Sequence, residues 1–377
     1  MSDTSLSTPE KKMSGFGRLY HGLTTVDFVG RKKIWFTASV IIILIGLGSL
    51  SVRGFNLGID FKGGSSWEVQ TTHSSVAAMT SAAEKAGLSN PTVTELGGKT
   101  FQVTADLNSL SAAQQQSVTT AVVDALAKEA GVAATAVSTA SVGPTWGGQV
   151  THRALEALLF FFLAVVLYIS FRFEPKMALA AFIAMIHDLL VTVGVYSLFG
   201  FQITPDTVIA ILTILGYSLY DTVVVFDRVR DNATSSTAVL KTGTMTYSEM
   251  VNLSMNQTLA RSINTSLVAI LPVMAVLLVG ADLLGATTLQ NYGLALFVGL
   301  MSGAYSSIFI ASPLLAIMKE REPRYRDLAA RVARSEHRTL TPQAAALLVT
   351  DVTGRSGASA RRPVTTVTPR ARKQKRR

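Results

Sequence analysis

Residues 177–199 read MALAAFIAMIHDLLVTVGVYSLF, an apolar run whose centre holds the pair His187-Asp188. The run has about the 20 residues that an α-helix needs to cross the hydrocarbon core of a bilayer. Similar runs occur at 33–52, 154–171, 205–226, 259–280 and 292–318. Six such runs predict an α-helical integral membrane protein with six transmembrane helices.

The composition favours the same class of protein. Hydrophobic residues make up 49% of the 377 residues and charged residues only 15%, against about 25% charged in typical soluble domains. The net charge of +10 does not indicate nucleic acid as a partner, because the basic excess lies between Lys319 and Arg377. A basic segment beside a span is typical of a cytoplasmic tail that meets lipid. The absence of cysteine excludes disulfides, thiol catalysis and cysteine-ligated metals.

The positions of Lys and Arg predict the orientation of the spans. Basic residues precede the first span and follow the second and fourth, whereas the loops at 200–204 and 281–290 have none. Both termini are therefore predicted to be cytoplasmic. The chain divides into a cytoplasmic N-terminal segment (1–32), a first span (33–52), an extracytoplasmic domain (53–150), five further spans (151–320) and a basic, largely disordered tail (321–377).

The predicted extracytoplasmic domain alternates strand and helix patterns. Strand-like runs at 66–71, 92–96, 101–105 and 133–142 are separated by helix-like runs at 75–86 and 111–130, with a turn at Gly97-Gly98. The order β-α-β-β-α-β is that of a small ferredoxin-like α+β domain. Because the domain has no ionisable cluster and no metal-ligand spacing, we expect binding or mechanical transmission rather than catalysis.

Four motifs stand at or near the ends of the predicted spans. They read LGIDFKGG at 57–64, SVGPTWG at 141–147, LGYSLYDTVVVFDRVRDN at 215–232 and NQTLARSINTS at 256–266. Together, and in this order, they resemble the SecF branch of the SecDF family of protein-export membrane proteins, within the RND superfamily. The resemblance covers about residues 30–320. The chain departs from it at Tyr220, where the family often has Asn, and in a longer loop around 235–244.

The resemblance implies an RND half-transporter that forms a heterodimer with SecD, since the RND architecture has twelve spans in two pseudosymmetric halves. It further implies a multi-pass protein of the bacterial cytoplasmic (inner) membrane. Such a protein would use the proton motive force to promote translocation of preproteins through the SecYEG channel, with SecA and YajC as further partners. An RND-type exporter of lipids or small molecules and a non-transporting scaffold of the translocase are the alternatives.

Enzymatic activity is not expected. The sequence has no phosphate-binding G-x-x-x-x-G-K-[ST] motif and no Gly-x-Ser-x-Gly or His-Glu-x-x-His motif. We therefore expect no cofactor and no metal, and ATP is not the expected energy source.

An ionisable group at membrane depth is costly and is therefore a functional candidate. Asp221 lies about 9 Å deeper along the fourth span than Asp227. The resemblance matches Asp221 to the proton-carrying aspartate of the family and Arg261 to its arginine partner. Burial disfavours a charged carboxylate and a nearby guanidinium favours it, so movement of Arg261 would control proton uptake and release. The alternative is a static ion pair that joins two helices.

Further polar residues of the spans are weaker candidates. His187-Asp188, near the midplane, could relay protons to Asp221 or could clamp neighbouring helices through hydrogen bonds. A polar stripe, with i, i+4, i+8 spacing on the fourth span and an extension on the fifth, comprises Thr213, Tyr217, Asp221, Asn264 and Thr265. We expect this stripe to face SecD. On the sixth span, Ser302, Gly303, Ala304 and Ser306 indicate close helix packing and no chemistry.

The junctions between the extracytoplasmic domain and the spans are rich in glycine. Their family-motif residues are Gly58, Asp60, Gly63, Gly64, Gly143, Pro144 and Gly147. Glycine permits tight turns and close backbone approach, so we interpret these residues as hinge or packing elements.

Overall fold

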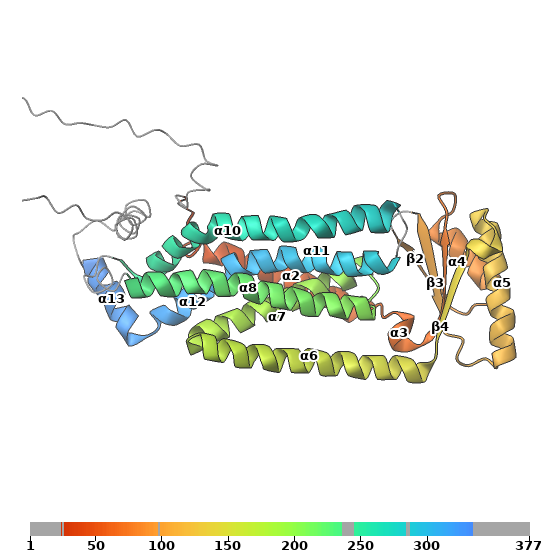
Figure 1. Ribbon diagram of the computed structural model, residues 1–377, viewed down its shortest axis with the longest axis horizontal. Helices are drawn as coiled ribbons and strands as arrows, with labels where there is room; N and C mark the ends of the chain where they lie inside the picture. The colour runs from red at the N-terminus through yellow and green to blue at the C-terminus, as the bar shows by residue number, and fades with distance from the viewer. Residues whose placement is uncertain (1–23, 25, 97–98, 236–244, 284–286, 335–377) are drawn as a thin grey trace, which may run out of the picture.

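A computed structural model describes residues 24, 26–96, 99–235, 245–283 and 287–334 of the chain. Within this part, helices long and apolar enough to cross a membrane cover Lys32–Arg53, Thr145–Arg172, Pro175–Phe199, Pro205–Thr234, Tyr247–Gly280 and Leu289–Glu320. They confirm the six predicted spans and a multi-pass membrane protein. Figure 1 shows an elongated bundle with a sheet domain at one end and α13 (Pro323–Arg334) at the other.

The ends of the helices follow local sequence signals. α6 (Pro144–Arg172) and α7 (Pro175–Phe199) begin with proline, which is favoured in a first turn because its missing N–H has no helical partner there. α10 (Tyr247–Ala275) opens with a capping box, in which Thr246 and Glu249 each accept a hydrogen bond from the other's backbone N–H. α10 therefore starts well before the apolar run predicted from residue 259. Two further long helices are α2 (Lys32–Arg53) and α8 (Pro205–Ser235).

The fifth and sixth spans contain π-helical turns. α10 continues into η2 (Val276–Leu283), and the sixth span comprises α11 (Thr287–Ser306), the π-helical η3 (Ser307–Ala311) and α12 (Ser312–Glu320). Pro313 lies just after η3 and has no N–H to donate to the preceding turn. The span thus widens before Pro313 and then continues.

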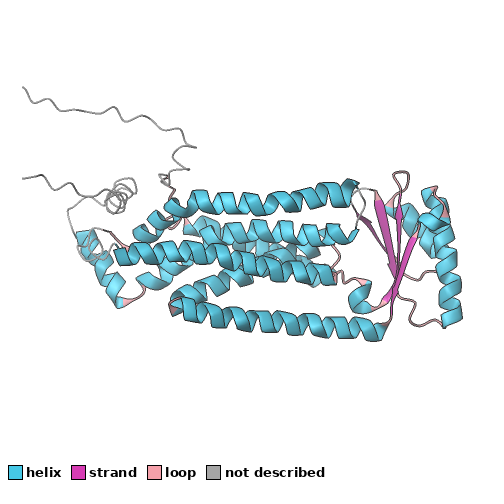
Figure 2. Ribbon diagram, viewed as in Figure 1, coloured by secondary structure: helices cyan, strands magenta, loops and turns pink. Residues whose placement is uncertain are grey.

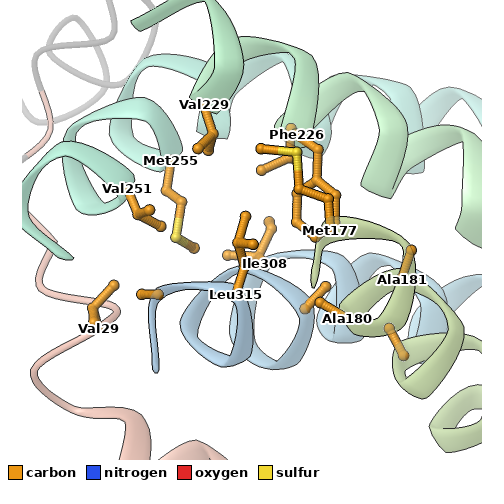
Figure 3. Close-up of a cluster of buried hydrophobic side chains, with 14 of the residues drawn as sticks. Val29, Met177, Ala180, Ala181, Phe226, Val229, Val251, Met255, Ile308 and Leu315 are labelled. Carbon is orange, nitrogen blue, oxygen red and sulfur yellow. The ribbon is translucent and has the colours of Figure 1, made fainter. Parts of the chain in front are cut away.

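A large cluster of buried apolar side chains holds the bundle together toward the end that carries α13. Met177 of α7, Phe226 of α8, Val251 of α10 and Leu315 of α12 all contribute to it. Val29, from the segment before α2, joins the same cluster (Figure 3). Most of these residues are fully buried, so their apolar surface stabilises the packing of the spans in the bundle.

The residues just before α2 are bound to α10. The backbone N–H of Phe28 donates to Oδ1 of Asn252 at 2.8 Å, and that of Val26 donates to Oδ1 of Asn256 at 2.9 Å. The end of the predicted N-terminal segment is thus part of the bundle. Residues 1–23 and 25, the loop at 236–244 and the predicted tail from 335 lie outside the described residues.

The sheet domain lies beyond the bundle and has two layers (Figure 2). Its elements are β1 (Gly64–Gln70), α4 (Val76–Lys85), β2 (Thr92–Leu96), β3 (Thr100–Ala105), α5 (Ala112–Ala130), η1 (Ala134–Ala136) and β4 (Ser138–Val142). The strands are antiparallel in the order β2-β3-β1-β4. Gly97-Gly98, the predicted turn, lies outside the described residues.

One face of the sheet carries α4 and α5. Trp67 of β1 and Phe101 of β3 are buried against Met79 of α4 and Leu126 of α5. These strand residues alternate with polar ones because successive side chains of a strand point to opposite faces. In Figure 1 both helices lie on the side of the sheet away from the bundle.

Candidate functional site

The sheet domain is tied to the bundle where α2 ends. The backbone N–H of Gly58 donates to the carbonyl oxygen of Ile203 at 2.8 Å, and the N–H of Ile203 donates to that of Asn56 at 2.8 Å. These bonds join the chain after α2 to the loop between α7 and α8. The start of the sheet domain is therefore held directly to the bundle by backbone hydrogen bonds.

Glycine is required at the two junctions themselves. Gly63, which follows the short helix α3 (Ile59–Lys62), and Gly64, the first residue of β1, have φ of 76° and 124°, a region that L side chains rarely adopt. At the other junction, a Cβ atom on Gly147 would lie 2.8 Å from the carbonyl oxygen of Phe61. The first turns of α6 therefore contact the backbone of α3.

The other residues of the junction motifs have different surroundings. Gly143 is the N-cap of α6 and Pro144 is its first residue, so residues 144–150 of the predicted outer domain are the first turns of a long helix. Asp60 of α3 is half-buried. Burial raises the pKa of Asp60 above its ordinary value of 3.8, and repulsion from Asp206 acts in the same direction, while a backbone hydrogen bond opposes them.

Asp221 lies inside the bundle, on the face of α8 that meets α10. Only 2% of its surface is exposed. The hydroxyl of Ser262 donates to its two carboxylate oxygens at 2.9 and 2.8 Å. The carboxylate is thus held at membrane depth by a neutral partner on the neighbouring helix.

The predicted partner of Asp221 lies elsewhere. Arg261 precedes Ser262 on α10, and its side chain is exposed in the isolated chain. The ion pairs among the described residues do not include Arg261 and Asp221. Asn264 is also exposed, whereas the half-buried Thr265 donates to the carbonyl oxygen of Ser262 at 3.0 Å.

The predicted polar stripe on α8 turns from the surface toward the interior. Thr213 is exposed and bonds to its own helix at Ile209, Tyr217 is half-buried, and Asp221 is buried. Each step of four residues rotates the side chain by about 40° around a helix with 3.6 residues per turn. The three residues therefore do not share one face.

Asp188 is the centre of a second polar cluster and is fully buried. Its Oδ2 atom accepts hydrogen bonds from Ser218 of α8 at 2.5 Å and from Ser306 of α11 at 2.7 Å. Its Oδ1 atom accepts one from Ser302 of α11 at 2.7 Å and lies 3.1 Å from Nδ1 of His187. One carboxylate thus connects three spans.

Sequence reasoning missed the hydroxyl partners of both carboxylates. Ser302 and Ser306 were predicted to act in packing alone, and that interpretation is incomplete because both hydrogen-bond to Asp188. Their i, i+4 spacing could have suggested a shared polar partner. Ser262 carried no comparable signal beyond its position next to Arg261. Within the described residues, no group of three or more His, Cys, Asp or Glu side chains could hold a metal ion.

Taken together, the fold and the two buried carboxylates define a multi-pass membrane protein with ionisable groups inside its helix bundle and a sheet domain outside it. The chain belongs to the SecD/SecF family of protein export membrane proteins: the family described as "Protein export membrane protein SecD/SecF, C-terminal" matches residues 122–321, and the "SecD/SecF GG Motif" matches residues 48–74.

Within that family the chain is similar to subunits named SecF. It is 44% identical over 316 residues to the "Protein translocase subunit SecF" of Streptomyces coelicolor, covering 84% of this chain and 82% of that one. It is 42% identical over 326 residues to the protein of the same name from Mycobacterium tuberculosis, covering 85% and 73%. The crystal structure of SecDF from Thermus thermophilus, described as a translocon-associated membrane protein, matches with a TM-score of 0.68 and 30% identity. The match covers 80% of this chain and 39% of the SecDF chain.

Proposed function

We propose that this chain is the SecF subunit of a SecDF complex that uses the proton motive force to promote preprotein translocation through the SecYEG channel. The observation that carries the proposal is the carboxylate of Asp221, which is 2% exposed within a membrane span. Proton uptake removes the charge of a carboxylate and also turns it from a pure acceptor into a donor. Either change alters the interactions that Ser262 and the neighbouring helices can make with this side chain.

A SecD partner is supported by the exposed face of α8 and α10. Thr213, Tyr220, Arg261 and Asn264 are exposed there in the isolated chain, all within helices long enough to span a membrane. Polar and charged side chains are costly against lipid at this depth. A second half-transporter would cover them, and the chain spans 39% of the SecDF chain that it resembles. Contact with that half would also place the guanidinium of Arg261 in a protein interface.

The sheet domain is proposed to be a ferredoxin-like domain that contacts the emerging preprotein. Its β-α-β-β-α-β order and its strand order β2-β3-β1-β4 support this assignment. Two connections would transmit movement of the spans to the domain: the backbone bonds between Gly58 and Ile203, and the contact of Gly147 with Phe61. Because these connections lie on different spans, relative movement of α6 and α8 would tilt the sheet.

Location and orientation follow from charge. Arg172, Lys176, Asp227 and Glu322 form ion pairs at the end of the bundle away from the sheet, at 2.8 Å for Arg172–Asp227 and 3.0 Å for Lys176–Glu322. Basic residues at span ends favour the cytoplasmic side. We therefore propose that this end is cytoplasmic in a bacterial inner membrane and that the sheet domain is extracytoplasmic. SecA and YajC are proposed as further partners of the complex.

The decisive experiment compares preprotein translocation into inverted membrane vesicles with and without a proton gradient. The vesicles contain the wild-type chain or Asp221→Asn, together with SecD and SecYEG. Asp221→Asn keeps the shape of the side chain but cannot be ionised. We expect the gradient-dependent stimulation to be lost, while SecD still co-purifies with the variant.

Ser266→Ala is the matched control, because Ser266 has a buried hydroxyl on α10 that donates to the carbonyl oxygen of Ser262 on the same helix and, within the described part of the chain, to no other helix. It should retain the stimulation. Normal gradient-dependent stimulation by Asp221→Asn would refute the proposal. An effect on translocation that an uncoupler leaves unchanged would point instead to a non-transporting scaffold.

A further inference from the structure

A groove opens between α6 and α8 at the end of the bundle that carries the sheet domain. Its volume is about 610 Å³, and its apolar walls include Val150 and Ala157 of α6 and Val208, Ile209 and Leu212 of α8. In Figure 1 both helices run from the sheet domain toward α13, so the groove leads inward from the outer boundary of the spans. Water in an apolar groove at membrane depth would have few hydrogen-bond partners. The groove is therefore suited to hydrocarbon.

Polar and aromatic side chains line the outer part of the groove. They are Trp146, Gln149, His152 and Arg153 of α6. Arg153 directly precedes the apolar run that begins at residue 154. Tryptophan and arginine at this level are typical of the interface between membrane and water, where lipid headgroups lie. The guanidinium of Arg153 thus lies at the level of lipid phosphates.

Arg153 shares this level with a carboxylate one turn along α6. Its Nη1 atom donates to Oε2 of Glu156 at 2.8 Å, and Nε2 of His152 lies 3.1 Å from Oε1 of the same carboxylate. The side chains of Arg153 and Glu156 are 80% and 47% exposed. A guanidinium has five N–H donors and a carboxylate about four acceptor positions, so both groups can bind further partners. With His152 counted as neutral, the set has one positive and one negative charge.

We infer that this groove binds a phospholipid whose headgroup carries both a phosphate and a primary ammonium group, as in phosphatidylethanolamine. The phosphate accepts hydrogen bonds from Arg153, the ammonium group donates to Glu156, and an acyl chain lies between α6 and α8. The balanced charge of the site decides between headgroups. Phosphatidylglycerol would bring a negative charge to Glu156 without a cation of its own, and the quaternary ammonium of phosphatidylcholine has no N–H to donate.

The rival occupant is a transmembrane helix of SecD, because the groove lies beside the face of α8 that is proposed to meet this partner. Between Trp146 and Ala157 the groove extends over about 16 Å of α6. A helix about 10 Å across would need about 1,200 Å³ over that length, or about twice the volume of the groove. A helix would therefore enter only in part, whereas an acyl chain is thin enough to lie within it. The inference does not depend on the use of a proton gradient.

The test measures lipid binding to the purified complex of the chain with SecD. Native mass spectrometry follows titration of the delipidated complex with phosphatidylethanolamine, phosphatidylcholine or phosphatidylglycerol that have identical acyl chains. We expect the site to bind phosphatidylethanolamine about fivefold or more tightly than the other two, since one charge near the membrane surface changes affinity by about this factor. Equal affinities for the three lipids would refute the inference.

Two charge variants assign the preference to the groove. Arg153→Gln should weaken binding of phosphatidylethanolamine by about fivefold. Arg53→Gln is the matched control, because Arg53 is an exposed arginine at the same end of the bundle but is not part of the groove. Glu156→Gln should weaken binding of phosphatidylethanolamine and leave that of phosphatidylcholine unchanged. If Arg153→Gln binds as the wild type does, the headgroup site is wrong.

A steric variant tests the apolar part of the groove. Ala157→Trp fills it and should abolish the bound lipid. Ala164→Trp, about two turns further along α6, is exposed and lies outside the groove, so it should retain the lipid. Equal retention by the two would overturn the inference. Thermal unfolding checks that each variant is folded, and Arg153→Gln decides the question if Ala157→Trp is not.

A cross-linking experiment distinguishes the lipid from a helix of SecD. The chain has no cysteine, so Leu212→Cys places a single reactive thiol in the groove. We expect this thiol to react with a lipid that carries a thiol-reactive acyl chain. An efficient short-range cross-link to SecD instead, with no reaction with the lipid, would show that a partner helix fills the groove and that the inference is wrong.

Discussion

Replacing Gly147 with alanine would test the contact between α6 and α3 on which the proposed movement of the sheet domain depends. An alanine Cβ would lie 2.8 Å from the carbonyl oxygen of Phe61 and 3.0 Å from the backbone nitrogen of Gly63. Ordinary contact begins at about 3.4 Å, and both neighbours are backbone atoms that cannot rotate away. The helices must therefore separate by about half an ångström, and such overpacking costs about 1–3 kcal/mol.

Gly148→Ala is a closely matched control. It lies one residue further along the same helix, and a Cβ there meets nothing within 4 Å. Both variants gain the same helix propensity, up to about 1 kcal/mol, so the difference between them isolates the clash. We expect thermal unfolding in detergent to occur several degrees lower for Gly147→Ala than for Gly148→Ala, and translocation activity to fall in parallel. Equal unfolding temperatures would refute the close contact.

Three further predictions concern single side chains. Ser262→Ala removes the hydroxyl that donates to the buried carboxylate of Asp221, and it should lower the free energy of unfolding by about 1–3 kcal/mol. Thermal unfolding should show a clearly smaller loss of stability for Ser266→Ala. Equal losses would contradict the hydrogen bond between Ser262 and Asp221. Asn256→Ala removes two hydrogen bonds to Val26 and should release the segment before α2, which would be seen as faster proteolysis before residue 30. Asn264→Ala, at an exposed position of the same helix, should leave the rate of proteolysis unchanged. Unchanged cleavage of Asn256→Ala would be evidence against this anchor. Because burial raises the pKa of Asp60 above 3.8, the folded protein holds this proton to higher pH than the unfolded chain. The resulting stability is complete below about pH 3.8 and is lost as the pH rises through the raised pKa. Asp60→Asn should therefore flatten the decline in unfolding temperature with rising pH, and an unchanged decline would exclude this group.

The sequence is most informative where the signal is local. A span is recognised from the length of its apolar run, and the elements of the sheet domain from alternation, capping residues such as Ser111 and glycine turns. Asp221 is likewise a candidate from sequence, because any carboxylate within such a run is unusual. None of these inferences needs to know which helix lies beside which.

The partners of the polar groups depend on how each helix is rotated about its axis. One residue along an α-helix turns a side chain by about 100°, so Arg261 and Ser262 face different directions although they are adjacent. The packing of α10 against α8 directs Ser262 to Asp221 and leaves Arg261 on the open face. No periodicity in the sequence specifies that rotation, because it is set by the packing of all the spans together.

The amino-acid sequence by itself therefore determined the membrane class, the number of spans and the candidate acid, since these depend on hydrophobic length and residue type. Only the tertiary structure decided that three serines from two other spans meet Asp188, and that residues 26–29 bind α10. Such contacts join residues more than 25 positions apart. They form only when helix packing brings their faces together, and the burial of polar groups then requires each to find a partner.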